Sequence, residues 1–243
     1  MKQLITLSII LSIAACKRPG DLFKSYGDDV TKIRQVTAYD GLEVGEKFDV
    51  VLVQDSTQDG RIEITAGEHV IDGYTTEVKN GTLYIQNSNQ FNWVRKLQIR
   101  QKVVLYFKDL NHINIKGSAK ITCKDTLVNP HELRIQHNGL EDAHFTVKGD
   151  YVFIDGYNTG GVVMAGKCFM LSASADDISY IDARDLYADK CYMVSFSKDD
   201  SYVFGHSVLD LQLRGTGNLY YKDSSTTQTS FKDLGEGNII PLP

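Results

Sequence analysis

The second half of the chain repeats a short apolar pattern about every 20 residues. Each repeat has one apolar residue on each side of a variable position. Successive repeats lie 19, 17, 23 and 17 residues apart. The pairs are Leu133-x-Ile135, Val152-x-Ile154, Phe169-x-Leu171, Tyr192-x-Val194 and Leu209-x-Leu211, and Ile113-x-Ile115 precedes them. One such repeat cannot bury its own apolar face, whereas stacked repeats pair each strand in parallel with its equivalents about 4.8 Å away. The pattern predicts an all-β fold, a right-handed parallel β-helix with about six rungs.

The repeats also carry turn residues at equivalent places. Asn, Asp and Gly tolerate the left-handed backbone that tight corners need. The alignment places residues 169–177 on residues 192–200, so that Cys168 falls on Cys191. The rung spacing suits the Cα separation of a disulfide, but two side chains that both point into the coil would instead form a pair of buried thiols. Both possibilities stay open.

The first hundred residues have a different character. Residues 48–53, 61–64, 82–85 and 102–107 alternate in the manner of strands, and Asn80-Gly81 is a strong hairpin signal. Residues 68–74 could form a helical turn. Hairpin-rich strands of this kind also fit a β-sandwich. We expect antiparallel strands that lead into the solenoid.

The N-terminus has the composition of an export signal. A single basic residue is followed by an apolar run from Leu4 to Ile13 and by Ala14-Ala15-Cys16. This segment resembles the lipobox of bacterial lipoproteins, although an ordinary secretory signal remains an alternative. We therefore expect a signal peptide at residues 1–15, lipid attachment at Cys16, a tether at residues 16–30 and a domain at residues 31–243. The protein would be an outer-membrane lipoprotein of the cell envelope, facing the periplasm or the surface.

Charge and motif content narrow the function further. The chain has 26 Lys and Arg residues against 31 Asp and Glu residues, for a net charge of −5. No basic stripe with interleaved aromatic residues is present, so nucleic acid is not an expected partner. The sequence contains no nucleophile elbow, phosphate loop or dinucleotide fingerprint, and its Cys and His residues lack the spacing of a zinc site.

Several segments resemble the head GIN domain family, a domain of unknown function labelled as an auto-transporter adhesin. Residues 48–52, 68–73 and 77–85 resemble its opening, and residues 213–221 and 235–239 resemble its terminal Gly-x-Gly-x-Leu motif. The resemblance spans residues 33–240. It implies a β-helical domain that is common in lipoproteins of the Bacteroidetes group, with no catalytic residues to carry over.

Two pairs of aspartates form the sharpest candidate for chemistry. Stacked carboxylates repel one another unless they are protonated, hydrated or bridged by a cation. They predict a calcium site, an acid and base pair for polysaccharide cleavage, or simple corner caps facing water. Cleavage would also need a nearby cation, for which Arg184, Lys190 and Lys198 are nearest in sequence. The four candidate metal ligands are Asp176, Asp177, Asp199 and Asp200; apart from calcium, no cofactor is expected.

Aromatic residues in the central repeats suggest a binding surface. Tyrosine combines an apolar ring with a hydroxyl group and suits carbohydrate stacking, although surface filling is the commoner role. The candidate binding residues are Tyr157, Tyr180 and Tyr187. We therefore expect a lipid-anchored, non-enzymatic, adhesin-like protein that binds a glycan or a cell-surface protein. The alternative is a polysaccharide lyase or hydrolase that uses the stacked aspartates.

Overall fold

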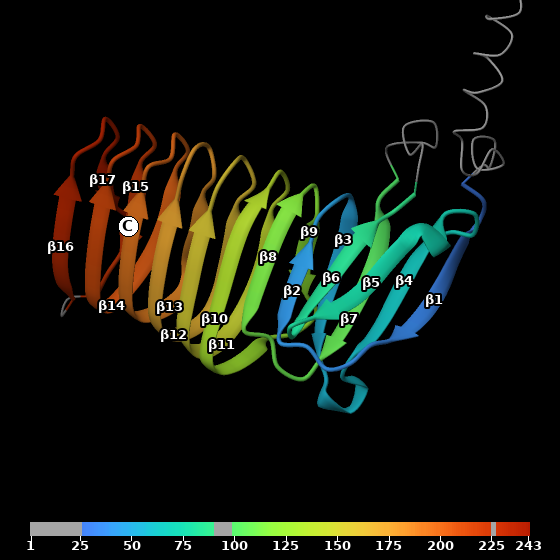
Figure 1. Ribbon diagram of the computed structural model, residues 1–243. Coiled ribbons are helices and arrows are strands. Elements are labelled where there is room, and N and C mark those ends of the chain that lie inside the picture. The colour runs from blue at the N-terminus through green and yellow to red at the C-terminus, as the bar shows by residue number, and fades with distance from the viewer. Residues whose placement is uncertain (1–25, 90–98, 225–226) are drawn as a thin grey trace, which may run out of the picture.

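The computed structural model describes residues 26–89, 99–224 and 227–243. It is an all-β fold in which most strands stack along one axis (Figure 1). The regular part of the stack consists of five long strands: β10 (Leu127–Gly139), β11 (Ala143–Gly156), β12 (Val162–Ala175), β13 (Ile181–Ser195) and β14 (Ser201–Leu213). Each pairs in parallel with the next. The expected parallel β-helix is confirmed.

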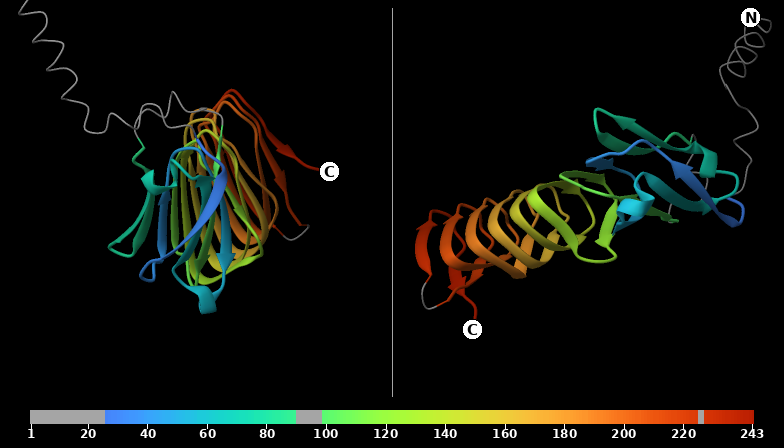
Figure 2. Two further views of the ribbon diagram at one scale, coloured as in Figure 1. Left: turned by 90° about the vertical axis from the view of Figure 1, so that its right-hand side faces the viewer. Right: turned by 90° about the horizontal axis from the view of Figure 1, so that it is seen from below.

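Each long strand bends in its middle, so its two halves lie on different faces of the solenoid (Figure 2). The first half of β14 pairs with β15 (Leu219–Lys222), whereas its second half pairs with β16 (Gln228–Asp233). At the C-terminal end, β17 (Ile239–Pro241) pairs in parallel with β15. Viewed along the axis, the strands form two faces joined at two edges (Figure 2). We call these the bend edge, where the long strands curve, and the turn edge, where loops connect them.

The N-terminal strands begin the solenoid and cover its end. β2 (Gly41–Val44) and β3 (Phe48–Gln54) form one rung, between β6 (Thr82–Asn87) and β7 (Gln101–Phe107) on one side and β8 (His112–Gly117) and β9 (Lys120–Cys123) on the other. β1 (Asp29–Gln35), β4 (Arg61–Gly67) and β5 (Tyr74–Lys79) pair antiparallel with their neighbours. The expected antiparallel N-terminal strands are therefore confirmed.

Local signals in this part of the chain have clear structural causes. Asn80 and Gly81 turn the β5–β6 hairpin with φ values of 50° and 78°, the left-handed geometry that this dipeptide favours. The expected helical turn is a short 3₁₀ segment, Ile71–Gly73, and a second one spans Ser56–Gln58.

The fold begins earlier than the expected domain. β1 begins at Asp29 and Tyr26 packs against the core, so residues 26–30 of the expected tether belong to the fold. No helix in the described part of the chain is long and apolar enough to cross a membrane.

The core is a set of apolar columns that run along the axis. One column is in register from rung to rung and almost fully buried; it consists of Ile113, Ile135, Ile154, Ala173, Met193 and Leu211. The next consists of Leu133, Val152, Leu171, Cys191 and Leu209. Successive positions in these columns are 18 to 22 residues apart, which explains the repeat in the sequence.

The structure corrects the expected register in two repeats. Leu171 and Ala173 are the inward pair of β12, and Cys191 and Met193 are the inward pair of β13. Phe169 and Tyr192 are 42% and 37% exposed. The pairing of β13 with β12 and with β14 contains register shifts. These shifts change which residues of β13 point outward, compared with a repeat of constant length.

The same shift separates the two cysteines that the sequence alignment superimposes. Cys168 pairs with Ala188 and Cys191 with Leu171, so the two thiols are not stacked in register. Both side chains are buried and free, and Cys123 is also free. Burial raises the pKa of the Cys168 thiol to about 12. These thiols therefore behave as apolar core groups.

Glycines at the turn edge permit close stacking of the last rungs. A Cβ atom on Gly217 would lie 2.1 Å from the Asp199 carbonyl oxygen, and one on Gly237 would lie 2.1 Å from the Gly217 carbonyl oxygen. The contact is with backbone, which cannot move aside as a flexible side chain could. The Gly-x-Gly motif is therefore a packing requirement of neighbouring turns.

Candidate functional site

A groove of about 500 Å³ lies on the bend edge, across β10 to β13. We call it the bend groove. Its lining combines aromatic, aliphatic and charged groups in a small area. The lining residues are Val128, Lys148, Gly149, Asp150, Lys167, Cys168, Phe169, Tyr187 and Asp189.

Aromatic rings form the apolar part of this groove. Phe169 is 42% exposed, and the ring of Tyr151 lies edge-on to it at 6.1 Å between centroids. Tyr187 packs against Phe204 at 5.5 Å and against His206 at 5.0 Å. Because neighbouring rings support one another, they offer a firm surface on which the face of a flat ligand could stack.

Lysine side chains lie over these rings. The Nζ atom of Lys167 is 4.8 Å from the ring centroid of Tyr187, and that of Lys190 is 5.1 Å from the ring centroid of Phe169. Lys222 lies 5.8 Å from Phe204 in the same way. Each ammonium group is attracted to the negative face of its ring while its aliphatic stem adds apolar contact.

Two carboxylates complete the groove. Asp189 accepts a hydrogen bond from the Ser207 hydroxyl, and Asp150 is exposed. Among the described residues, neither lies within ion-pair distance of Lys148 or Lys167. The groove thus contains both signs of charge without internal neutralisation.

The structure brings only one of the three candidate tyrosines into this groove. Tyr187 lines it, whereas Tyr157 and Tyr180 lie at the opposite, turn edge. Tyr157 is 39% exposed. The Tyr180 ring lies against Gly161. The pKa of its hydroxyl is raised chiefly by burial and, to a smaller extent, by the neighbouring Asp142 carboxylate. A single strip that unites all three tyrosines is therefore not formed.

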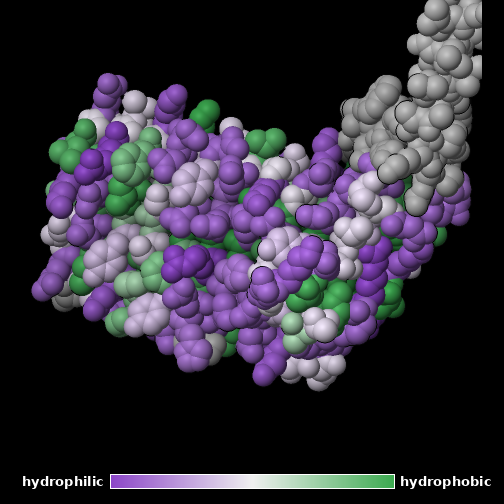
Figure 3. Space-filling view, in the orientation of Figure 1, coloured by the Kyte–Doolittle hydropathy of each residue, from purple (hydrophilic) through white to green (hydrophobic). Residues whose placement is uncertain are grey.

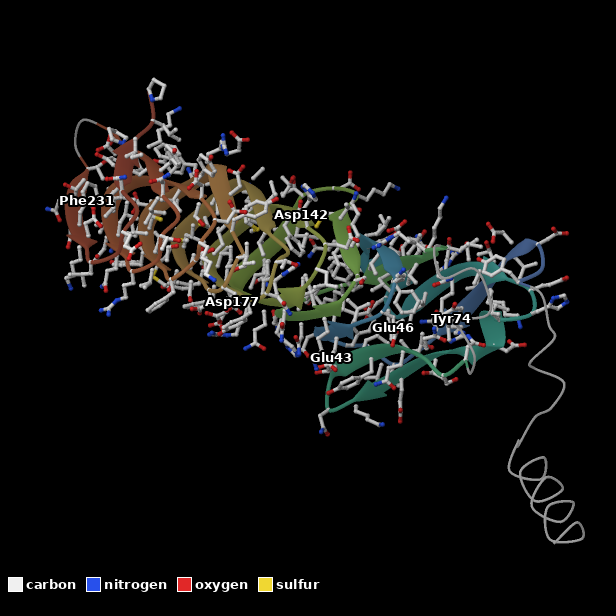
Figure 4. The ribbon with its side chains drawn as sticks, turned by 90° about the horizontal axis from the view of Figure 1, so that it is seen from above. Glu43, Glu46, Tyr74, Asp142, Asp177 and Phe231 are labelled. Atoms are coloured by element: carbon white, nitrogen blue, oxygen red, sulfur yellow. The ribbon has the colours of Figure 1, made fainter. Side chains whose placement is uncertain are left out.

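The four candidate aspartates lie along the turn edge, where Figure 4 labels Asp142 and Asp177. Backbone pairing places Phe196 beside Asp176 and Lys198 beside Ile178. Asp176 and Asp177 therefore lie at the start of one turn, whereas Asp199 and Asp200 lie at the end of the next turn. The two acidic pairs are thus offset and do not form the expected stack. No group of three or more His, Cys, Asp or Glu side chains suited to a metal ion occurs in residues 26–89, 99–224 and 227–243.

Individual aspartates make corner contacts. Asp177 has a left-handed backbone with φ of 57°. The Asn218 backbone N–H donates to Asp200 Oδ1 at 2.7 Å, and the Asp200 N–H donates to Asp199 Oδ1 at 2.8 Å. Desolvation, then Asp177 and Asp155, raises the pKa of Asp176. These contacts are those of turn caps.

Two of the three cations expected beside the acids, Arg184 and Lys190, are engaged elsewhere, whereas Lys198 lies on the turn edge with the acids. Arg184 forms an ion pair with Asp182 at 2.8 Å, and its guanidinium lies 3.7 Å from the ring centroid of Tyr202. Lys190 lies over Phe169 at the bend edge. Lys198 is exposed on the turn edge, and its backbone N–H donates to the Asp177 carbonyl oxygen. Cys16, the predicted lipid attachment site, lies outside the described residues.

Comparison with known proteins identifies the family. The family described as "Putative auto-transporter adhesin, head GIN domain" matches residues 38–225, which is most of the chain. The chain belongs to the head GIN domain family. None of the curated proteins matches this head GIN chain. The resemblance read from the turn and core motifs is thereby confirmed.

Solved structures share the fold of this head GIN protein. A crystal structure described as a "putative adhesin" from Bacteroides fragilis has a TM-score of 0.83 at 18% identity, and the match covers 90% of this chain and 100% of that chain. A "putative adhesin" from Parabacteroides distasonis has a TM-score of 0.62 at 17% identity, with the same coverage. A "Putative lipid binding protein" from Parabacteroides distasonis has a TM-score of 0.64 at 19% identity, covering 90% of this chain and 99% of that one. At these identities the likeness extends to the fold alone.

Sequence reasoning missed most of the bend groove. Lys148 and Lys167 are 19 residues apart, one repeat, and this spacing was an available signal. The hydrophobic repeat predicts Phe169 as a core residue, because it sets this repeat two positions out of register. The pairing of β12 instead places Leu171 and Ala173 inward and leaves Phe169 exposed.

Proposed function

We propose that this head GIN protein is a lipid-anchored, non-enzymatic binding protein of the cell envelope, and that its bend groove binds a glycan. The observation that carries this proposal is the exposed ring of Phe169, which lines a groove on a rigid solenoid together with Tyr187. Sugar rings present C–H groups on their faces, and aromatic side chains complement them while neighbouring polar groups bind hydroxyls.

The face of the solenoid next to the bend edge favours a local site over a broad apolar contact. Figure 3 shows one face of the molecule as mostly hydrophilic, with hydrophobic side chains in separate patches between polar ones. A large protein interface commonly has a continuous apolar centre. A groove with a few aromatic and charged groups is better suited to a chain-like polar ligand.

Glycan-array binding with matched variants tests the proposal. Removing the Phe169 ring should weaken binding about tenfold, since a stacked ring contributes about 1 kcal/mol or more. Tyr187→Ala should weaken binding similarly, and circular dichroism should verify that both variants fold. Tyr192→Ala is the control, because Tyr192 is 37% exposed but lies outside the groove lining. Equal binding by all four proteins would refute the groove as the site.

The enzymatic alternative is tested with the same protein. A polysaccharide lyase or hydrolase would release new chain ends from some substrate in a reducing-end or unsaturated-product assay. We expect no product from any polysaccharide that binds. A reproducible product that disappears in the Asp176→Asn and Asp199→Asn variants would overturn the non-enzymatic proposal.

A further inference from the structure

We infer that the ligand of the bend groove is an acidic glycan, one that carries carboxylate or sulfate groups. This inference rests on the proposed glycan binding and specifies its substrate class. Its basis is a column of two lysines and one tyrosine that crosses three rungs in register: Lys148 pairs with Lys167, and Lys167 pairs with Tyr187.

Two lysines in directly paired positions carry an electrostatic cost. Neighbouring strands lie about 4.8 Å apart, and like charges that face one another across a strand pair destabilise it. Lys148 and Lys167 are both exposed and both line the groove. An anion placed between the two ammonium groups would remove this repulsion and gain two charge-assisted hydrogen bonds.

Three lysines elsewhere in the protein show how a carboxylate partner is held. Lys79 pairs with Glu77 at 2.8 Å and Lys116 pairs with Glu43 at 2.9 Å, and Lys32 pairs with Asp72. In the described part of the chain, no carboxylate lies within 4.0 Å of the ammonium groups of Lys148 and Lys167. Backbone pairing thus sets two lysines without a carboxylate partner on neighbouring strands, and the Lys167 ammonium lies over the Tyr187 ring.

The acids of the groove occupy a separate column. On one side of Phe169, the flanking residues of β12 pair with Ala188 and Lys190, so Phe169 lies beside Asp189. On the other side, the pairing with β11 places Phe169 beside Asp150. Asp189 is engaged by the Ser207 hydroxyl. The groove therefore has a basic column and an adjacent column in which an aromatic ring separates two carboxylates.

An acidic sugar matches both columns. Its ring can stack on Phe169 or Tyr187, while a carboxylate or sulfate in the plane of the ring reaches the lysines. Its hydroxyls can donate to Asp150 and Asp189, as carboxylates accept such bonds readily. A neutral glycan would make the stacking contacts but would give neither ammonium group an anionic partner.

The test compares matched glycans on one array. Polygalacturonate and its fully methyl-esterified form share a backbone and differ in charge, and chondroitin sulfate and its desulfated form do the same for sulfate. The other glycans on the array are likewise grouped as acidic and neutral. We expect binding to acidic glycans only, weakening as salt is raised from about 0.05 M to about 0.5 M because screening shortens the Debye length.

Charge-removing variants assign the effect to the column. Lys148→Gln and Lys167→Gln should each weaken binding about tenfold, the loss expected for one charge-assisted hydrogen bond. The matched control is Lys198→Gln, which removes one exposed charge on the opposite edge. Circular dichroism should show that all three variants retain the parent fold.

The outcomes separate this inference from the proposed function. Equal binding to neutral and acidic glycans, unchanged in the lysine variants, would keep glycan binding and overturn the acidic specificity. Binding to no glycan would overturn both. Binding to anionic phospholipid vesicles that is lost in the lysine variants, without glycan binding, would assign the column to lipid headgroups and also overturn the inference.

Discussion

Replacing Met193 by Ala should destabilise the protein strongly, whereas replacing its neighbour Val194 should not. Met193 is 1% exposed and lies in the core column between Ala173 and Leu211. Because Ala173 is small, it cannot fill the space that the Met193 side chain leaves. We expect a loss of about 2–5 kcal/mol in the free energy of unfolding, made up of the transfer of the side chain and the residual cavity.

Val194 is the matched control because it is adjacent in sequence but lies on the outer face of the same sheet. Its half-buried side chain pairs with Ser174 and Gln212, so Val194→Ala should cost about 0.5–1 kcal/mol. Urea unfolding followed by circular dichroism measures both values, with an unchanged slope indicating comparable unfolded states. A larger loss for Val194→Ala than for Met193→Ala would contradict the register and with it the assignment of inward residues.

Three further perturbations test other parts of the structure. Burial lowers the pKa of His137 below its ordinary value of 6.5. As the pH drops below 6.5, the unfolded chain therefore binds the proton before the folded protein does, and the free energy of unfolding should decrease. A His137→Gln variant whose melting temperature has the same pH dependence would contradict this. Gly217→Ala should cost about 1–3 kcal/mol through its clash with the Asp199 carbonyl oxygen, whereas Thr216→Ala in the same turn should cost about 0.5 kcal/mol or less, as measured by urea unfolding; equal costs would rule out the packing role of Gly217. Cys16→Ser should abolish incorporation of a fatty-acid analogue in a lipoprotein-processing host, and undiminished labelling would argue against lipid attachment there.

Features encoded by neighbouring residues could be predicted from the sequence. Asn80-Gly81 specifies a hairpin through backbone preferences that act within two residues, and the structure has that hairpin. The repeat likewise predicts a solenoid, because a fixed spacing of apolar residues reflects stacked rungs.

Features that depend on exact register could not be predicted in the same way. Ala173 and Cys191 occupy core positions but are small, whereas the larger apolar residues Phe169 and Tyr192 face outward. An alignment guided by hydrophobic size therefore selects the wrong positions. Irregular pairing along β13 adds to the error, because it changes how many residues separate equivalent positions.

The candidate site depends on this register still more strongly. The expected stack of aspartates assumed that residues 176–177 and 199–200 occupy equivalent places, and backbone hydrogen bonds at the turn edge show that they do not. Lys148 and Lys167, by contrast, are one repeat apart in a regular stretch and do pair. Regular rungs thus preserve relationships that the sequence displays, and irregular ones do not.

The in-register stacking of the long strands has a consequence for how such a binding surface can change in length. Each rung contacts chiefly the rungs before and after it, so a whole rung is a modular unit of about 20 residues. Duplication of the segment from Ile154 to the residue before Ala173 would insert one rung without altering the inward columns, and would extend the bend edge by about 4.8 Å. Insertion or loss of complete rungs therefore offers members of this architecture a route to binding longer or shorter ligands while the core stays the same.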